Sequence, residues 1–307
     1  MAVGVPDSVT VCDVGPRDGL QNLPTVLPVS TRLELIEKLA AAGMPKVEAA
    51  SFVNPERVPA MAGADEIFAA LDQRESVTFP GLILNEKGYE RALAAGVREI
   101  RFGFSASDEF GLRNQRKDSA EGLASARALV ARAHGDGLQI GVTISVAFGC
   151  PFSGPVDRGR IADLVGSLMA DPPDEISLAD TIGVAVPTQV RDLVADAVAT
   201  GATVNGHFHD TRNTGIANAV AAIEAGAVSL DASVGGAGGC PFAPNATGNI
   251  ASEDLIYLLQ GMGVETGVDL EALIETSHWL GRQLGIELPS MVAKAGIPTI
   301  AAPAGDR

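Results

Sequence analysis

Two histidines, His207 and His209, stand two positions apart in the segment Asn205-Gly-His-Phe-His-Asp-Thr211. The residues from Ala202 to His209 have the composition of a β-strand, in which side chains point alternately to opposite faces. Both imidazoles should therefore project to one side, with their Cα atoms roughly 7 Å apart. This spacing suits two ligands of one divalent metal ion. The alternative is that the histidines have a structural role.

The overall composition limits the kind of partner. The chain has 307 residues and a formal net charge of −16, which argues against nucleic acid or an anionic membrane. The three cysteines, Cys12, Cys150 and Cys240, are far apart and odd in number, which argues against a disulfide framework or a structural zinc site. We expect reduced thiols.

The N-terminal residues, Met1 to Asp7, contain no basic segment followed by an apolar stretch. Nowhere do about 18 apolar residues follow one another without interruption. We therefore expect a cytoplasmic protein with no membrane partner.

Short β-branched runs alternate with Ala- and Leu-rich stretches, a pattern typical of a parallel sheet with crossover helices. The runs interpreted as strands are Val9–Asp13, Lys46–Ala50, Val77–Leu84, Glu99–Phe104, Gln139–Val146, Glu175–Ala179, Ala202–His209 and Ser229–Val234. About eight strands close a (β/α)8 TIM barrel, which is the α/β fold class that we predict. We expect a single domain over residues 1–307, with the barrel at about 9–250 and extra C-terminal helices and a tail at 251–307.

Helical periodicity follows most of these runs. Thr31 and Glu34 have the spacing of a capping box, and Gly43 would end the helix that they begin. Further helices are predicted at Glu90–Ala95, Ser119–Asp136, Val156–Ala170, Pro187–Ala199, Thr214–Gly226, Ser252–Met262 and Asp269–Leu284. The tail from Pro289 to Arg307 is expected to be loosely held, with docking over one end of the barrel as the alternative.

Polar residues gather where predicted strands end and the next loops begin, which is where the active sites of such barrels lie. They are Arg17, Asp18, Glu48, Ser107, Asp180, His207, His209, Cys240 and Asn249. Closure of the barrel would place the last strands beside the first, so Asp18, the two histidines and Asn249 should converge. An open, doubly wound sheet would keep them apart.

Five motifs occur in order along the chain. They are Gly15-Pro-Arg-Asp-Gly-Leu-Gln-Asn22, Val47-Glu-Ala-Ala-Ser-Phe-Val53, Glu175-Ile-Ser-Leu-Ala-Asp-Thr-Ile-Gly183, His207-Phe-His-Asp210, and Gly238-Gly-Cys-Pro-Phe242 leading to Gly248-Asn249. From about Val9 to Leu284 the chain thereby resembles the 3-hydroxy-3-methylglutaryl-CoA lyase family. That family belongs to a wider group of metal-dependent barrel lyases and Claisen-type synthases.

The resemblance implies retro-Claisen cleavage of 3-hydroxy-3-methylglutaryl-CoA, an acyl-CoA substrate, to acetyl-CoA and acetoacetate. It also implies the ligands of a divalent cation, which are Asp18, His207, His209 and Asn249. Mixed oxygen and nitrogen ligands with open positions favour Mg²⁺ or Mn²⁺, although imidazoles also accept zinc, cobalt or nickel. A cation would acidify the C3 hydroxyl as a Lewis acid. The proton itself would go to Asp18 or His207.

The resemblance gives two further residues a chemical role. Arg17 would be the electrophile that stabilises the thioester enolate, with a structural ion pair to a carboxylate such as Asp180 as the alternative. Cys240, in a glycine-rich loop, would deliver the proton that quenches the enolate, with a small buried thiol as the alternative. The carboxylates expected to support the site are Asp13, Glu48, Asp180 and Glu253. Asp13 stands where the family often has a glutamate.

The chain departs from the family pattern at two places that border the substrate pocket. Leu23-Pro24 stands where many of these lyases have Glu-Lys, and Arg212-Asn213-Thr214 where they usually have Tyr-Gly-Gln. An added arginine beside the metal would suit a carboxylate or phosphate, so the acyl group would differ from 3-hydroxy-3-methylglutaryl. The alternative is that these loop positions vary without an effect on the substrate. The candidate substrate and CoA contacts are Ser107, Arg113, Arg116, Lys117 and Arg212.

Three other interpretations compete with the leading one. A lyase for another tertiary 3-hydroxyacyl-CoA, such as a longer branched glutaryl-CoA, uses the same site. A Claisen-type synthase is less favoured, because synthases usually have Asn where Asp210 follows the histidines, and carry extra C-terminal domains. A barrel that binds ligands without catalysis is disfavoured by the intact set of polar residues. We expect a homodimer, as the family suggests.

Overall fold

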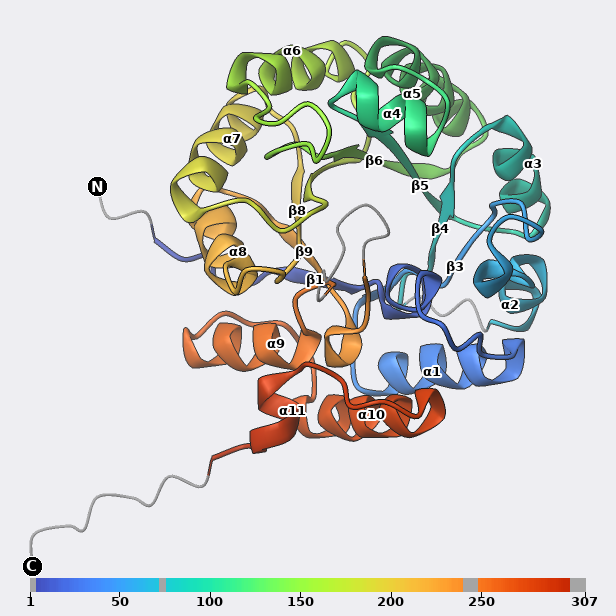
Figure 1. The fold of residues 1–307 in the computed structure, drawn as a ribbon, viewed down its shortest axis with the longest axis vertical. Helices are drawn as coiled ribbons and strands as arrows, with labels where there is room; N and C mark the ends of the chain where they lie inside the picture. Colours follow the sequence, from blue (N-terminus) through green and yellow to red (C-terminus); the bar gives the residue numbers. More distant parts are fainter. Residues whose placement is uncertain (1–3, 72–75, 240–247, 299–307) are drawn as a thin grey trace, which may run out of the picture.

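The computed structural model of the protein describes residues 4–71, 76–239 and 248–298. A ring of parallel strands is surrounded by helices (Figure 1). The strands are β1 (Thr10–Asp13), β2 (Lys46–Val47), β3 (Ala50–Ser51), β4 (Pro80–Ile83), β5 (Glu99–Ser105), β6 (Gln139–Ser145), β7 (Glu175–Asp180), β8 (Val204–Phe208) and β9 (Ser229–Ala232). Every strand pair recorded in the described part of the chain is parallel, as the alternating pattern predicts.

The sheet closes through one segment that bonds to a strand on either side. β2 pairs with β1, and β3 pairs with β4. Between them, Glu48 N donates to Asp13 O at 2.9 Å and Ala49 N donates to Pro80 O at 3.0 Å. β2 and β3 are thus two halves of the single strand predicted at Lys46–Ala50. The predicted barrel fold is confirmed.

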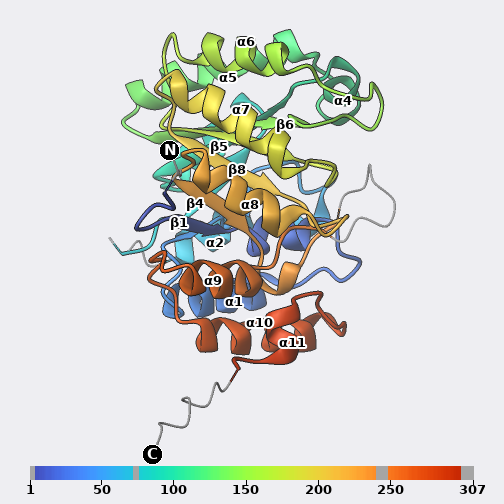
Figure 2. The ribbon, with the colours of Figure 1, turned by 90° about the vertical axis from the view of Figure 1, so that its left-hand side faces the viewer.

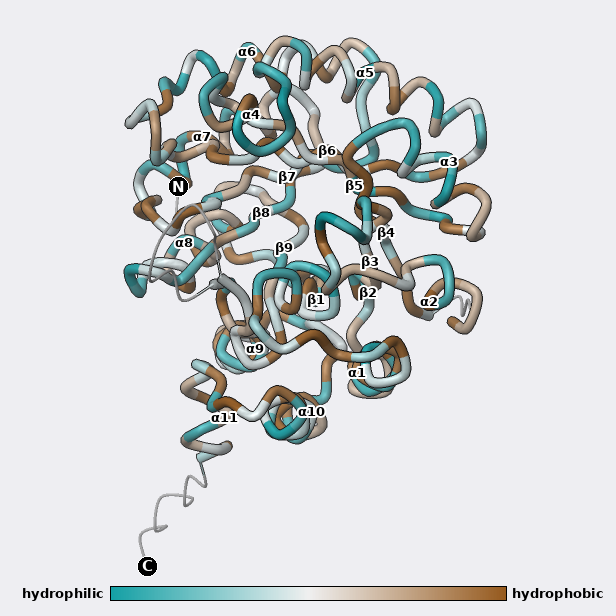
Figure 3. The backbone as a smooth tube through the Cα atoms, turned by 45° about the vertical axis from the view of Figure 1, so that its right-hand side comes forward, coloured by the Kyte–Doolittle hydropathy of each residue, from teal (hydrophilic) through white to brown (hydrophobic). Residues whose placement is uncertain are grey.

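Helices cover the outside of the ring. They are α1 (Val29–Ala41), α2 (Ala64–Ala70), α3 (Glu86–Ala94), α4 (Asp108–Asn114), α5 (Ser119–Gly135), α6 (Arg158–Leu168), α7 (Pro187–Ala199), α8 (Gly215–Glu224), α9 (Ser252–Gly261), α10 (Leu270–Leu284) and α11 (Met291–Ala295). Hydrophobic and hydrophilic stretches interleave along them (Figure 3). The apolar side chains of the helices pack with those of the sheet in one core. In the described part of the chain, no helix has the length and apolarity needed to cross a membrane.

Several predicted helix boundaries were wrong. α1 begins at Val29 with Pro28 at its N-cap, so Thr31 and Glu34 lie inside the helix and form no capping box. Proline fixes the backbone angle φ and has no N–H to satisfy, which suits the start of a helix. α3 begins at Glu86 because the Asn85 side chain accepts from Gly88 N and caps it there.

The C-terminal helices form an extra layer beside α1 (Figure 2). Its last helix, α11, is held by the carboxylate of Asp254 in α9, which accepts from Ser290 Oγ at 2.9 Å and Val292 N at 2.7 Å. Ser290 N also donates to Gly235 O at 3.0 Å. The described part of the tail, up to residue 298, is therefore docked rather than loosely held. Through Ser290 it also contacts Gly235, at the start of the glycine-rich loop.

Two buried carboxylates tie the barrel to α9. Asp13 accepts from Gly15 N at 2.8 Å and from Ser252 Oγ at 2.6 Å. Both oxygens of Glu253 lie 2.9 Å from Gly235 N, which donates to them. Burial raises the pKa of Asp13 to about 7 and the pKa of Glu253 to about 8, although these hydrogen bonds oppose the rise.

Glu253 should make the stability of the fold depend on pH. Its folded pKa of about 8 lies above its ordinary value of 4.5, so the folded state holds the proton more tightly than the unfolded state. This contribution to the free energy of unfolding is complete below the ordinary pKa and is lost as the pH rises through about 8. We expect a loss on the order of a few kcal/mol between roughly pH 5 and pH 9.

Urea unfolding across that pH range measures this loss. Glu253→Gln cannot titrate and should show a smaller fall than the wild type, whereas Glu275→Gln, at an exposed position of α10, should match the wild type. Comparison of the variants separates Glu253 from other titrating groups, including Asp13, whose raised pKa acts in the same direction. An unchanged pH dependence in Glu253→Gln would show that the buried carboxyl is not the cause.

Candidate metal centre and active site

Three of the predicted metal ligands meet at the carboxyl ends of β1 and β8. Asp18 lies in the π-helical turn Gly15–Gly19 after β1, His207 lies in β8, and His209 follows it directly. One potential ligand atom from each of these three residues lies within 4.8 Å of the others. The two imidazole centroids are 5.3 Å apart, as expected for residues on one face of a strand.

Asn249, the fourth predicted ligand, lies against the same carboxylate. Its Nδ2 donates to Asp18 Oδ2 at 2.8 Å. The backbone holds it there, because Asp210 N donates to Gly248 O at 2.9 Å and Ile250 N donates to Phe208 O at 3.1 Å. Gly248 has φ of +94°, and a Cβ on it would lie 2.6 Å from the carbonyl carbon of Gly238. Glycine is therefore required beside Asn249.

The donor set fits a divalent cation. His209 Nε2 lies 4.0 Å from Asp18 Oδ2, about twice the length of a typical bond from zinc to nitrogen or oxygen. His207 Nδ1 is 3.1 Å from Asp231 Oδ2, which leaves Nε2 as the nitrogen for a metal. Among the described residues, buried His209 Nδ1 and Glu48 Oε1 have no hydrogen-bond partner. Carboxylate, amide and imidazole ligands together are compatible with several divalent ions.

The pKa values of the three groups reflect burial and their mutual charges. Burial favours the neutral form of Asp18, but Arg17 and the two imidazoles outweigh it and lower the pKa of Asp18 to about 2. Burial and the neighbouring His207 lower the pKa of His209 to about 4, which keeps this imidazole neutral and able to bind a cation. Burial also lowers the pKa of His207, but Asp231 and Asp18 raise it above its ordinary value.

Arg17 pairs with two carboxylates of the site. Its Nε donates to Glu48 Oε2, and its Nη1 donates to Asp18 Oδ1 at 2.5 Å. The expected alternative partner, Asp180, is not the one found. Asp180 instead accepts from Val184 N at 2.9 Å and Ala185 N at 3.0 Å and thereby holds the loop after β7. The π-helical turn aims Arg17 toward Glu48, across the pair of strands β1 and β2.

Four of the predicted substrate and CoA contacts, Ser107, Arg113, Arg116 and Lys117, lie in or beside α4, after β5. Ser107 caps α4 and hydrogen-bonds Cys150 Sγ at 3.1 Å, while the Arg113 guanidinium lies 4.2 Å from the centre of the Phe152 ring. These contacts join the segment after β6, which contains Cys150 and Phe152, to α4. Burial raises the pKa of Cys150, but hydrogen bonds from Ser107 and Ser153 outweigh this and lower the pKa.

The remaining basic candidates are also placed by local contacts. Lys117 Nζ donates to Ser125 Oγ at 2.7 Å, and the neighbouring Arg116 has a left-handed backbone with φ of 59°. Arg212 Nη1 donates to Ile182 O at 3.0 Å and Gly183 O at 2.7 Å. Arg212 is thus tied to the loop after β7. Cys240, the predicted proton donor, lies outside the described residues.

Two residues of the site escaped the sequence interpretation. Asp231 in β9 contacts His207, and Arg101 in β5 contacts Asp231 at 2.9 Å. Both are charged residues within predicted buried strands, which is the one signal that marks them in the sequence.

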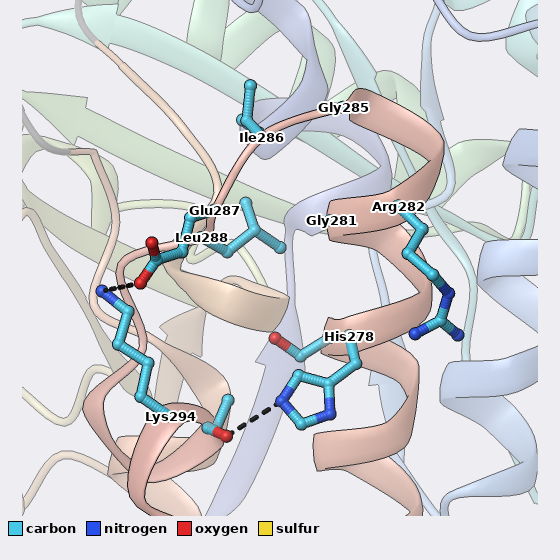
Figure 4. A pocket seen from close by; sticks show the side chains of 10 residues that line it. His278, Gly281, Arg282, Gly285, Ile286, Glu287, Leu288 and Lys294 are labelled. Atoms are coloured by element: carbon cyan, nitrogen blue, oxygen red, sulfur yellow. Dashed lines mark hydrogen bonds and ion pairs between the residues drawn. The ribbon is translucent and has the colours of Figure 1, made fainter.

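A groove of about 510 Å³ beside α10 and α11 contains none of the predicted site residues, and its Lys294 is paired with Glu287 (Figure 4).

Comparisons with known proteins agree with this geometry. The chain is 48% identical to the (R)-citramalyl-CoA lyase of Chloroflexus aurantiacus, over 94% of this chain and 95% of that protein. It is 40% identical to the 3-hydroxy-3-isohexenylglutaryl-CoA/hydroxymethylglutaryl-CoA lyase of Pseudomonas aeruginosa, over 95% of this chain and 98% of that protein. The structure matches an HMG-CoA lyase from Acinetobacter baumannii in complex with coenzyme A and 3-methylmalate, with a TM-score of 0.91 and 38% identity, over 97% of this chain and 98% of that one. The HMGL-like family model matches residues 8–280, and the chain therefore belongs to this family.

Proposed function

We propose that the protein is a divalent-cation-dependent lyase that cleaves a 3-hydroxy-3-methyl-acyl-CoA into acetyl-CoA and a keto acid. The observation that carries the proposal is the meeting of Asp18, His207 and His209 beside the Arg17 guanidinium. In the reaction the C3 hydroxyl loses its proton and becomes a ketone as the C2–C3 bond breaks. The bonding electrons pass to the thioester enolate, and a proton on C2 completes acetyl-CoA.

Asp18, His207, His209 and Asn249 would hold the cation, which would supply Lewis acidity toward the C3 hydroxyl. We favour Mg²⁺ or Mn²⁺ as the bound ion because oxygen ligands are present. The two imidazoles also suit zinc, cobalt and nickel. The hydroxyl proton would go to Asp18 or His207. His207 Nδ1 already contacts Asp231, and the two Asp18 oxygens accept from Arg17 and Asn249, so the hydrogen bonds do not choose between the two residues.

Arg17 would stabilise the enolate. Its ion pairs with Glu48 and Asp18 hold the guanidinium in one orientation at the mouth of the barrel, so little reorganisation is needed when charge develops on the thioester oxygen. Cys240 stays the predicted source of the proton for C2. A homodimer in the cytoplasm also stays a prediction.

The substrate that we place first is (R)-citramalyl-CoA. The 48% identical relative is named for it, whereas relatives named for hydroxymethylglutaryl-CoA lie at 36–40%. The two thioesters share a tertiary C3 that carries a hydroxyl and a methyl group, but the acid arm of citramalyl-CoA is one methylene shorter. The departures at Leu23-Pro24 and Arg212-Asn213-Thr214 also favour a different acyl group. 3-Hydroxy-3-methylglutaryl-CoA is the second candidate.

Turnover of the two thioesters tests the reaction and the substrate together. The Mn²⁺-loaded protein should release acetyl-CoA and pyruvate from (R)-citramalyl-CoA with a kcat/KM at least about tenfold above that for 3-hydroxy-3-methylglutaryl-CoA, since one methylene typically changes binding by about 1–3 kcal/mol. EDTA should abolish release, and added Mg²⁺ or Mn²⁺ should restore it. Faster cleavage of 3-hydroxy-3-methylglutaryl-CoA would reverse the order of substrates. A folded, metal-loaded protein that cleaves neither would refute the proposed reaction.

Replacement of Arg17 tests the assignment of the enolate sink. Arg17→Met should lower kcat by about 10²–10³ or more, because one lost donor to an oxyanion costs about 3–4 kcal/mol of barrier. Because Arg17 also pairs with buried Glu48 and with Asp18, stability and Mn²⁺ affinity are measured alongside, by thermal unfolding and calorimetric titration, and kcat is compared on folded protein at saturating Mn²⁺. Arg191→Met, which removes an exposed partner of Glu224 in α8, is the control and should leave kcat unchanged. Substantial activity in Arg17→Met would show that another group stabilises the enolate.

A further inference from the structure

Asp231 lies directly beside His207 in the sheet. β8 and β9 are adjacent parallel strands, and His207 and Asp231 are paired in their register. Both side chains are on one face, and His207 Nδ1 is 3.1 Å from Asp231 Oδ2. A carboxylate at this nitrogen holds the ring in one orientation and keeps the proton on Nδ1. This leaves Nε2 of His207 as the nitrogen for a cation bound together with Asp18 and His209.

Arg101 holds Asp231 from across the barrel. In strand order β8, β7 and β6 stand between β9 and β5, so the guanidinium reaches Asp231 through the interior of the barrel rather than along the sheet. Its Nη1 donates to both Asp231 oxygens, at 2.9 and 3.1 Å. Its Nη2 donates to Glu175 Oε1 at 3.2 Å. Asp231 therefore accepts from the Arg101 guanidinium at both oxygens, while its Oδ2 also contacts His207.

The pair is almost fully withdrawn from solvent. Arg101 is 3% exposed and Asp231 is 4% exposed. A buried charge without a partner is costly, so the two side chains fix each other's position. His209 offers the contrast, because its buried Nδ1 has no partner among the described residues. The two imidazoles of the site are thus held to different degrees.

We propose that Asp231, clamped by Arg101, is a positioning residue that fixes His207 for cation binding. The inference rests on the proposed function only in taking His207 as a ligand of the cation. Glu175 shares the Arg101 guanidinium and also accepts from Ser229 Oγ at 2.7 Å, but its recorded hydrogen bonds do not include His207. It therefore provides a control of matched burial and charge within the same network.

The test compares Asp231→Asn with Glu175→Gln in the absence of substrate. Asp231→Asn should weaken Mn²⁺ binding about 10–100-fold, the usual cost of losing the outer partner of a ligating histidine. The visible absorption bands of the Co²⁺-loaded variant should also change, because they report the arrangement of ligands. Glu175→Gln should lose comparable thermal stability while it keeps Mn²⁺ affinity within about threefold and an unchanged Co²⁺ spectrum.

Two outcomes would overturn the inference. Wild-type Mn²⁺ affinity in Asp231→Asn would show that the contact between Asp231 and His207 does not act on the cation site. An equal loss of Mn²⁺ affinity in Glu175→Gln would show that Asp231 and Arg101 only support the structure in general. Should Asp231→Asn not fold, Arg101→Lys serves as the second variant. It keeps the positive charge but loses the planar guanidinium that contacts Asp231 and Glu175, and we expect a smaller loss of Mn²⁺ affinity than in Asp231→Asn. Because no substrate is present, these results do not depend on which acyl-CoA is cleaved. Failure of the wild type to bind Mn²⁺ would refute the cation proposal and this inference together.

Discussion

The site depends on closure of the sheet. The segment from Lys46 to Ser51 bonds to β1 on one side and to β4 on the other and closes the ring, while β1 pairs directly with β9, so the first and last strands of the chain lie side by side. β1 then lies between β2 and β9, and β9 lies beside β8. Asp18 after β1, Glu48 between β2 and β3, and His207 in β8 can meet only in this arrangement. The main-chain pairing of β1 with β9 and of β9 with β8, together with the closing segment that carries Glu48, thus assembles side chains that are far apart in the sequence.

Closure also creates an interior in which charges must find partners. Lys46 pairs with Glu99 at 2.8 Å, and Arg101 pairs with Asp231 and Glu175. Replacing such buried pairs by apolar residues often costs no stability, so the pairs themselves are weak evidence of a stabilising role. What they do supply is fixed orientation. The chain of contacts from Arg101 through Asp231 to His207 carries that orientation to the proposed cation site.

The sequence allowed the strands, the barrel and the approach of Asp18 to the histidines to be predicted, because β periodicity and barrel closure are regular. Other features depend on geometry that no periodic pattern encodes. The partners of Arg17 follow from a π-helical turn at Gly15–Gly19, and the contact of Arg101 with Asp231 crosses the barrel. The short helices α2 and α4 were missed because seven residues carry little helical periodicity. The start of α1 was misplaced because the N-cap of the helix is Pro28 rather than Thr31.

In the proposed reaction, the choice of acyl group would depend on residues outside the cation site. Any tertiary 3-hydroxyacyl-CoA presents the same hydroxyl and thioester, so the roles proposed for Asp18, the histidines and Arg17 would be the same for citramalyl and hydroxymethylglutaryl thioesters. The two differ in how far the acid arm extends from C3. Arg212 is fixed by the carbonyls of Ile182 and Gly183, just after Asp180 at the end of β7. Its charge is therefore positioned by that loop rather than by a ligand, so we expect the loop after β7 to act in selecting the length of the acid arm.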